Sequence, residues 1–443
     1  MPRREILSTF HIGIDDTDSS DGMCTTFLCY NLVKKLTGMG VRLLDYPNLI
    51  RLNPNIPWKT RGNAALVLRI QTTISRKKIF AICESFVRKF ATSPRANSGL
   101  VLFEGESIPE EIANFSKRAL HSVLGLREAR ALIEKYGLDS LGLRSQQGLV
   151  GALAGVGNTL PGDHTYELIA YRENLKLPRK VERSKVVLMS NATYPRTFSN
   201  LDFDYGRIMI APHGPDPVLC GIRGERAEDV LEATKMLEPL ENHSGWMIVR
   251  SNQGTGEHLR EPIGLDEPKA YLSGKLRAVV STIPRVETGG HVFFQVRNEE
   301  GVIDCACYEP TADFRKHAME LIPGDEIEVG GGIRKSTSKH PKVLNLEYFE
   351  VLRLADKLKL SNPKCDKCGT AMKSEGRGQG FACEKCSRKD KTAKKVDIKV
   401  KRNLERKIYL PPVKAHRHLT KPIQRFSVGR KSVPSKLIRN WID

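Results

Sequence analysis

A hydrophobic, strand-like segment from Thr9 to Ile14 runs directly into three closely spaced carboxylates, Asp15, Asp16 and Asp18. Carboxylates this close repel one another unless a cation lies among them, and Mg²⁺ carrying nucleotide phosphates is a natural partner for such oxygen ligands. The pattern therefore predicts a site for Mg²⁺ at Asp15 and Asp16, and with it ATP. An acidic loop closed by side-chain-to-backbone turns is the competing interpretation.

The residues after the carboxylates suit a phosphate. Gly22 precedes Thr25 and Thr26, where an amphipathic helix begins, with apolar residues at helical spacing at Leu28, Leu32, Val33 and Leu36. Backbone N–H groups and the helix dipole favour an anion at such a helix start. We expect Gly22 and Thr26 to contact phosphate beside the Thr25 hydroxyl. In the alternative interpretation, Thr25 or Thr26 only caps the helix.

The chain contains no GxxxxGK[ST] sequence, so a nucleotide must be held in another way. The polar loop 51–63 is rich in Pro, Asn and cations, and we predict that its Lys59 and Arg61 bind ATP phosphates. Arg51 lies in the same loop. The Gly-rich stretch Gly148 to Gly157 fits either a phosphate cradle or close backbone packing, and the sequence leaves both open.

Four of the ten cysteines form two CxxC pairs separated by fourteen residues: Cys365, Cys368, Cys383 and Cys386. Two such turns point four thiolates inward and predict a structural zinc site with no open position for catalysis. The residues between them, Lys373 to Phe381, suit a β-hairpin that offers cations to phosphates. Zinc in place of disulfides indicates a reducing compartment.

The net charge of +20 is unevenly distributed, because residues 387–443 hold 18 Lys and Arg against 4 Asp and Glu. A dense basic segment joined to a zinc ribbon is typical of nucleic-acid binders, although a solubilising tail is the simpler alternative. The apolar runs are too short to span a membrane, and no secretion signal opens the chain. We expect a cytoplasmic protein with no membrane partner.

The chain divides into four units, which together predict a multidomain α+β protein. Residues 1–175 alternate strands and helices and form an α/β domain. Residues 176–265 suggest a ferredoxin-like domain, with strands at 186–189, 207–211, 217–222 and 246–250 and a helix at 227–237. Residues 266–355 resemble a five-stranded OB-fold barrel with one helix near 312–321. Residues 356–443 hold the zinc ribbon and a basic tail.

Other polar segments follow or open strands. His164 could be a general base, but a lone histidine is more often structural. The segments 212–217 and 251–256 are polar enough to line a pocket, and turn formation is the alternative explanation for both.

The string from His11 to Thr26, HIGIDDTDSSDGMCTT, resembles the N-terminal signature of the archaeal tRNA-isoleucine agmatinylcytidine synthetases. The segments IPWKTRGN (56–63), DHTYELIAYR (163–172), APHGPDPVLCG (211–221) and SNQG (251–254) extend the resemblance over essentially the whole chain.

The resemblance implies a ligase that replaces the 2-oxo group of the wobble cytidine of an isoleucine tRNA with agmatine, so that a CAU anticodon reads AUA. It also implies an unusual kinase domain, ferredoxin-like and OB-fold domains, a zinc ribbon, consumption of ATP to AMP and phosphates, and phosphorylation of the C2 oxygen. The family's phosphorylated threonine corresponds to Thr25 here. Because agmatine is a dication, its pocket needs carboxylates, and Asp163, Glu167 and Asp216 are the candidates.

Two other functions compete with this interpretation. A non-catalytic single-strand-binding protein would need only the barrel, ribbon and basic tail, but it leaves the residues from Asp15 to Thr26 unexplained. A plain RNA or small-molecule kinase would use that cluster without transferring an amine.

Overall fold

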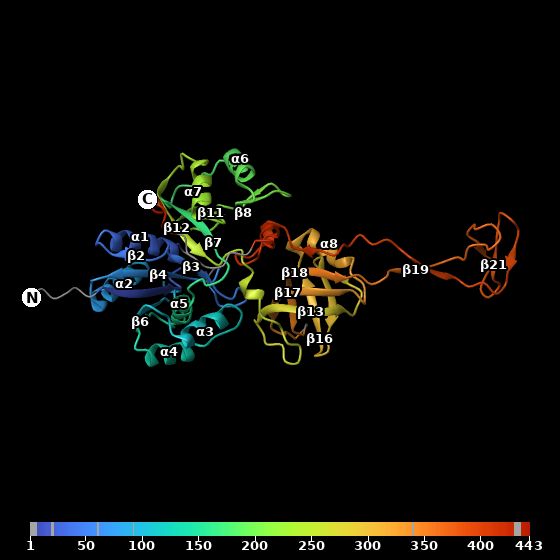
Figure 1. Cartoon of the computed structure of the whole chain (residues 1–443), viewed down its shortest axis with the longest axis horizontal. Helices are drawn as coiled ribbons and strands as arrows, with labels where there is room; N and C mark the ends of the chain where they lie inside the picture. Colours follow the sequence, from blue (N-terminus) through green and yellow to red (C-terminus); the bar gives the residue numbers. More distant parts are fainter. Residues whose placement is uncertain (1–6, 19–21, 60–61, 92, 339–340, 429–435) are drawn as a thin grey trace, which may run out of the picture.

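The computed structural model describes residues 7–18, 22–59, 62–91, 93–338, 341–428 and 436–443. A layered body holds the first half of the chain, a barrel lies beside it, and a small ribbon extends from the barrel on a long two-stranded stem (Figure 1).

The body is built on one mixed sheet in the order β6-β5-β1-β4-β3-β12-β7-β11-β8, with β2 paired to β4. Its strands are β1 (Ser8–Asp15), β2 (Arg42–Leu43), β3 (Asn48–Arg51), β4 (Ala64–Thr72), β5 (Gly99–Glu104), β6 (Asp139–Gly142), β7 (Thr165–Arg172), β8 (Thr197–Phe198), β11 (Val218–Gly224) and β12 (His243–Ser251). A separate pair joins β9 (Leu201–Asp202) to β10 (Arg207–Ile208).

Helices cover both faces of this sheet, which explains why its central strands are apolar on both sides. One face carries α1 (Thr25–Thr37), α2 (Arg76–Phe90), α6 (Arg183–Thr193) and α7 (Ala227–Lys235). The other carries α3 (Glu110–Ala119), α4 (Leu126–Lys135) and α5 (Gly148–Gly157).

The Gly-rich stretch is the buried helix α5, and its glycines permit close packing. A Cβ on Gly13 of β1 would lie 2.2 Å from the Ala152 carbonyl oxygen, and a Cβ on Gly148 would lie 2.4 Å from the Gly99 nitrogen. Backbone packing therefore explains most of this stretch, and its N-terminal end borders the cavity described below.

The expected strand at 9–14 and helix at 25–36 are confirmed as β1 and α1, but the expected strand at Val186–Met189 is wrong. These residues lie in α6, where Val186 and Met189 are buried one helical turn apart. A short apolar run does not by itself distinguish the two structures. Strand β7 lies between β12 and β11, so the sheet runs continuously across the boundary expected near residue 175.

The five expected strands of the third unit are confirmed, and they close into a barrel through β13-β17-β18-β16-β15 and the β13–β15 pairing. The five strands are β13 (Ser273–Val280), β15 (His291–Arg297), β16 (Val302–Cys307), β17 (Glu326–Arg334) and β18 (Val343–Arg353), and a short additional strand, β14 (Arg285–Glu287), pairs with β15. Helix α8 (Asp313–Met319) fills the predicted position after β16, and short 3₁₀ turns occupy Glu257–Leu259 and Glu309–Thr311.

The zinc-ribbon region follows the barrel on a stem formed by β19 (Leu358–Ser361) and β23 (Val396–Lys399). It contains β20 (Lys373–Ser374), β21 (Phe381–Ala382) and β22 (Lys389–Asp390), and β20 and β21 form the expected hairpin.

The chain after the ribbon, which we expected to form a basic tail, folds back onto the barrel and the body. Strand β24 (Ile408–Tyr409) pairs with β18, and 3₁₀ turns at Val413–Ala415 and Ile423–Arg425 lead back to the body. The C-terminus lies beside the body helices (Figure 1), where the Asp443 N–H donates to the Trp246 carbonyl. Leu404, Leu419 and Trp441 are buried, so this basic segment contributes to both the barrel and the body.

Candidate active site

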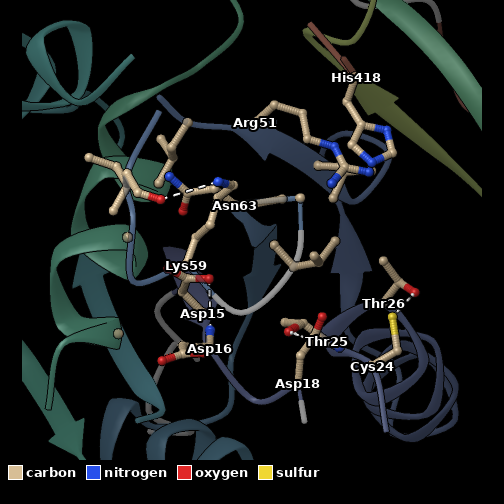
Figure 2. A pocket seen from close by; sticks show the side chains of 18 of the residues that line it. Asp15, Asp16, Asp18, Cys24, Thr25, Thr26, Arg51, Lys59, Asn63 and His418 are labelled. Atoms are coloured by element: carbon tan, nitrogen blue, oxygen red, sulfur yellow. Dashed lines mark hydrogen bonds between the residues drawn. The ribbon is translucent and has the colours of Figure 1, made fainter. Parts of the chain in front are cut away.

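A cavity of about 590 Å³ lies where the end of β1 meets β3, β7, β11 and the starts of α1 and α5 (Figure 2). The polar residues that line it include Asp15, Asp16, Asp18, Thr25, Thr26, Arg51, Lys59, Asn63, Asn97, Gln147, Glu167, Asp216, Arg223 and His418. Figure 2 shows the carboxylates on one side and Arg51 with His418 on the other.

Asp15, Asp16 and Asp18 form the acidic side of the cavity. Asp15 Oδ1 accepts a hydrogen bond from the Asp16 N–H at 2.7 Å, and Asp16 adopts a φ of 52° that turns the chain sharply there. Burial, and then the neighbouring charge of Asp16, raise the pKa of Asp15 well above its usual value. A divalent cation would offset this repulsion, so the donor set fits Mg²⁺.

Thr25 is the first residue of α1, and the capping position belongs to Cys24, whose side chain makes no capping hydrogen bond. The interpretation of Thr25 or Thr26 as the N-cap is therefore wrong. The Thr25 N–H and hydroxyl both donate to Asp18 Oδ1, at 2.5 and 2.7 Å, and the Thr17 hydroxyl donates to Thr25 Oγ1 at 3.0 Å. The hydroxyl thus lies buried at a helix start among the carboxylates. Gly22 does not line the cavity.

The basic side of the cavity combines residues that are far apart in sequence. Burial lowers the pKa of Arg51 to about 10. Arg223, on β11, donates from Nη2 to Nδ1 of His418 at 2.9 Å. Lys59 lies on the lining with its side chain largely exposed, and partial burial lowers its pKa. Arg61 lies outside the described residues.

The three carboxylates expected to bind agmatine separate in the structure. Glu167 and Asp216 line the cavity, and both are already paired, Glu167 with Arg223 at 3.3 Å and Asp216 with Arg179 at 3.3 Å. Asp163 is not on the lining and pairs with the buried Arg425 at 2.8 Å. His164 is also off the lining, in edge contact with Tyr166.

Sequence reasoning missed Arg223 and His418. One feature of the sequence could have indicated Arg223, because it is a cation inside the otherwise apolar run of β11. No such feature marks His418, which lies in a basic segment that resembles a solvated tail. Their position at the cavity depends on tertiary contacts between distant segments.

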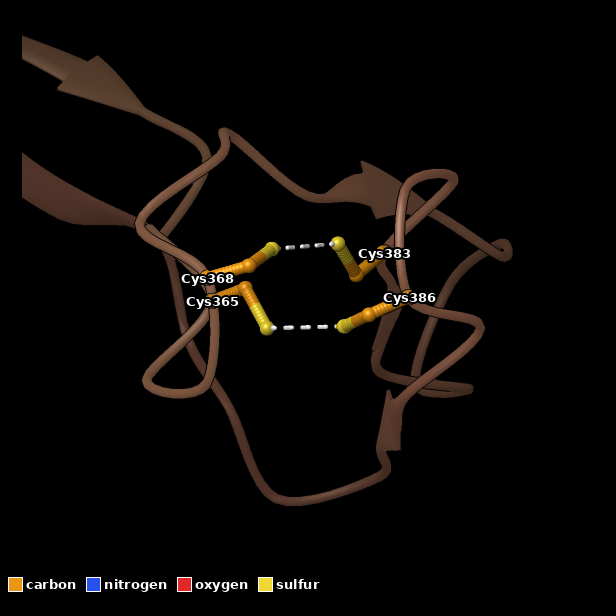
Figure 3. Close-up of side chains that lie close together, drawn as sticks. All are labelled: Cys365, Cys368, Cys383 and Cys386. Atoms are coloured by element: carbon orange, nitrogen blue, oxygen red, sulfur yellow. Dashed lines mark hydrogen bonds between the residues drawn. The ribbon is translucent and has the colours of Figure 1, made fainter.

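The four CxxC cysteines converge in the ribbon (Figure 3). Their Sγ atoms all lie within 4.8 Å of one another, with Cys365 and Cys386 at 3.5 Å and Cys368 and Cys383 at 3.3 Å. A four-sulfur cluster of this size fits a tetrahedral zinc ion. All ten cysteines are free thiols.

Within the described residues, no helix is both long and apolar enough to cross a bilayer.

Three family models match this chain: the TiaS TCKD domain at residues 11–81, the TiaS FLD domain at 146–258 and the TiaS C-terminal zinc ribbon domain at 362–404. Among curated relatives, the tRNA 2-agmatinylcytidine synthetase TiaS of Cenarchaeum symbiosum is 42% identical over 94% of this chain and 92% of its own length. The chain belongs to the TiaS family.

Other members of the TiaS family are similar to this chain over nearly its whole length. The Staphylothermus marinus synthetase is 38% identical over 96% of both chains. A solved complex of TiaS with isoleucine tRNA and ATP is similar to this chain with a TM-score of 0.81 at 36% identity, covering 95% of this chain and 98% of that one. A complex of TiaS with isoleucine tRNA, AMPCPP and agmatine has a TM-score of 0.80 at 34% identity, with the same coverage.

Proposed function

We propose that this TiaS-family protein is the ATP-dependent ligase that joins agmatine to C2 of the wobble cytidine in the CAU anticodon of isoleucine tRNA, so that the tRNA reads AUA. The observation that carries the proposal is the cavity, which holds a carboxylate cluster and a helix-start threonine facing two arginines. Relatives that match over 95% of the chain have been solved with ATP, isoleucine tRNA and agmatine, which supports the assignment.

In this proposal the nucleotide phosphates lie between the two sides of the cavity. Asp15 and Asp16 hold Mg²⁺, with Asp18 beside them, and Arg51, Lys59 and Arg223 face the phosphates. When bound, Mg²⁺ neutralises phosphate charge during transfer. Thr25 accepts a phosphoryl group from the nucleotide through its hydroxyl oxygen, the shortened nucleotide is the leaving group, and water later releases the group as phosphate. Thr26 and the start of α1 contribute the positive end of the helix dipole. Arg61 stays a candidate from the sequence.

The chemistry follows from the leaving group. The 2-oxo group of cytidine is amide-like and leaves poorly. Transfer of a phosphoryl group from ATP to this oxygen, with the shortened nucleotide as leaving group, allows the neutral amine of agmatine to attack C2. The C2–O bond then breaks, phosphate leaves with the oxygen, and the amine nitrogen gives its proton to water. Glu167 and Asp216 are the lining carboxylates that would attract the agmatine cation, since Asp163 is paired with Arg425 outside the lining.

The second half of the chain supplies RNA binding in this proposal. Cys365, Cys368, Cys383 and Cys386 hold a structural zinc ion, and the ribbon presents its lysines and arginines to phosphates. The barrel is assigned to the OB-fold class, members of which often bind single-stranded nucleic acid. A tRNA substrate implies a cytoplasmic location.

Incubation of the full chain with ATP, Mg²⁺, transcribed isoleucine tRNA and labelled agmatine tests this function against its rivals. The expected result is label in the tRNA that depends on ATP and on the wobble cytidine. Binding without turnover would favour a single-strand-binding protein, and phosphate transfer without label in the tRNA would favour a kinase. Either outcome contradicts the proposal.

A further inference from the structure

The segment after the zinc ribbon returns to the active site and places His418 in its lining. Hydrogen bonds hold it on both sides of this residue: the Lys414 N–H donates to the Asp202 side chain at Oδ2 at 2.9 Å, and the Gly256 N–H donates to the Leu419 carbonyl at 2.8 Å. The Gly254 N–H donates to the His418 carbonyl itself at 2.9 Å. Hydrogen bonds therefore attach the backbone around His418 directly to the body.

Around His418, five side chains form a ring on the basic side of the cavity. Arg51 Nε donates to Gln253 Oε1 at 3.2 Å, and Gln253 Nε2 donates to Glu167 Oε2. Arg223 joins Glu167 to His418, because its Nε donates to Glu167 Oε1 at 3.3 Å and its Nη2 donates to His418 Nδ1 at 2.9 Å.

The ring is completed at Gly62, where the side chains of Arg51 and His418 both lie against the backbone. A Cβ on Gly62 would lie 2.5 Å from Arg51 Nη1 and 2.8 Å from Cδ2 of His418. Because His418 Nδ1 accepts a hydrogen bond from Arg223, the neutral ring carries its proton on Nε2. An imidazole in this form separates two guanidinium groups without adding a third positive charge.

We propose that His418 is a positioning residue, a neutral imidazole that holds the Arg223 guanidinium through Nδ1 and lies between it and the Arg51 guanidinium, so that both groups face the nucleotide phosphates. This inference rests on the proposed function, because it assigns phosphate binding to the basic side of that cavity. It follows that residues beyond the zinc ribbon complete the ATP site.

The surroundings of His418 favour its neutral form. The charge of Arg51, burial and the charge of Arg223 hold the pKa of His418 well below its usual value. The groups that face it are Arg51 from β3 and Arg223 from β11, with Glu167 from β7 on the far side of Arg223. The imidazole is therefore neutral at neutral pH, and protonation of Nδ1 would remove the acceptor that holds the Arg223 guanidinium.

Three variants of the full chain separate positioning from stability. In His418→Asn, the amide oxygen replaces the Nδ1 acceptor, whereas His418→Leu removes it and His418→Lys adds a cation. His416→Asn is the matched control, because His416 lies on the same segment, hydrogen-bonds the Pro411 carbonyl at 2.9 Å and does not line the cavity. Titration with Mg·ATP, tRNA binding and thermal unfolding are measured for each.

We expect His418→Leu and His418→Lys to weaken ATP binding by about tenfold or more, with tRNA affinity within a few-fold of the wild type. His418→Asn should recover most of the ATP affinity, because its amide oxygen can accept the hydrogen bond from Arg223. Equal losses in Asn and Leu, or unchanged ATP affinity with only a lower unfolding temperature, would overturn the proposal. Because Mg·ATP titration needs no agmatine transfer, this result stays distinct from a wild-type chain that fails to modify tRNA.

Discussion

Thr25 donates both its N–H and its hydroxyl to the same oxygen of Asp18. Since Cys24 occupies the capping position, the hydroxyl is not needed to start the helix, which favours a chemical role. We predict that Thr25→Ser keeps partial activity and that Thr25→Asn folds but is inactive, because only serine retains a phosphorylatable hydroxyl. Mass spectrometry of the wild type after incubation with ATP should find phosphate on the peptide containing Thr25. An unmodified peptide together with an active Asn variant would make Thr25 structural.

A substitution at Gly151 tests whether the position of Asp15 matters, because a Cβ on Gly151 would lie 1.7 Å from Asp15 Oδ2. Gly151→Ala should therefore displace this carboxylate and reduce ATP turnover by at least about tenfold, while tRNA affinity stays within a few-fold. Gly125→Ala is the matched control, since a Cβ there meets nothing within 4 Å and the φ of Gly125 is −93°. Normal turnover in Gly151→Ala would argue against a catalytic role for Asp15.

Direct substitution of the carboxylates is a separate test. We expect Asp15→Ala and Asp16→Ala to abolish ATP turnover and to leave tRNA affinity within a few-fold of normal, because these residues are assigned to Mg²⁺ and not to RNA. Turnover assays and tRNA titrations measure the two effects, and full turnover in both variants would exclude the metal role.

At the scale of single residues, the sequence was sufficient to group Asp15, Asp16, Asp18 and Thr25, because they lie within one short segment at the end of a strand. It assigned Lys59 to the same nucleotide, and in the structure Lys59 lines the same cavity. It was not sufficient for Arg223 and His418, which reach the cavity through the pairing of β11 and the return of the C-terminal segment. The ion pair that takes Asp163 away from the cavity also involves a distant residue, Arg425.

At the scale of elements, a strong strand or helix periodicity predicted the secondary structure correctly, whereas a short apolar run did not. Strand β1, helix α1 and the barrel strands matched their patterns, whereas Val186–Met189 fits either period and forms helix. The segment after β24 carries no periodic pattern, and its structure depends on docking. Arg425 is its main buried anchor, paired with Asp163 at 2.8 Å and with Glu225 at 2.5 Å.

Arg425→Met should lower the free energy of unfolding by about 3–5 kcal/mol, because it leaves two carboxylates buried without their cation. Chemical denaturation measures this change. Arg439→Met, at an exposed arginine of the same segment, should cost less than about 0.5 kcal/mol. Equal stability of the two variants would mean that the segment is not anchored through Arg425.

At the scale of the whole molecule, the order of the units along the chain could be expected from the sequence. The contacts that join them in space could not. One sheet passes through both halves of the body, and the chain returns from the ribbon to the active site. Removal of residues 387–443 would therefore also remove buried residues such as Tyr409 and Trp441, and it would not isolate the effect of charge. The ribbon alone offers a cleaner test.

Residues 357–400 hold 13 Lys and Arg against 5 Asp and Glu, and the Val400 N–H donates to the Lys357 carbonyl at 2.9 Å, so a short linker can replace the segment. We predict that this excision weakens tRNA binding and flattens its salt dependence by about 0.7–0.9 in log–log slope for each phosphate that the ribbon neutralises. ATP affinity should not change. A salt slope equal to that of the full chain would show that the ribbon binds no phosphates.

The central claim is that the cavity activates the C2 oxygen of cytidine by phosphorylation, and tracing that oxygen tests it most directly. The full chain is incubated with ATP, agmatine and isoleucine tRNA carrying ¹⁸O at C2 of the wobble cytidine, and the released products are analysed by mass spectrometry. Our account predicts one ¹⁸O in inorganic phosphate for each agmatine joined, and none when Asp15 is replaced by alanine. Agmatine incorporation with the ¹⁸O in AMP, or in no phosphate at all, would contradict it.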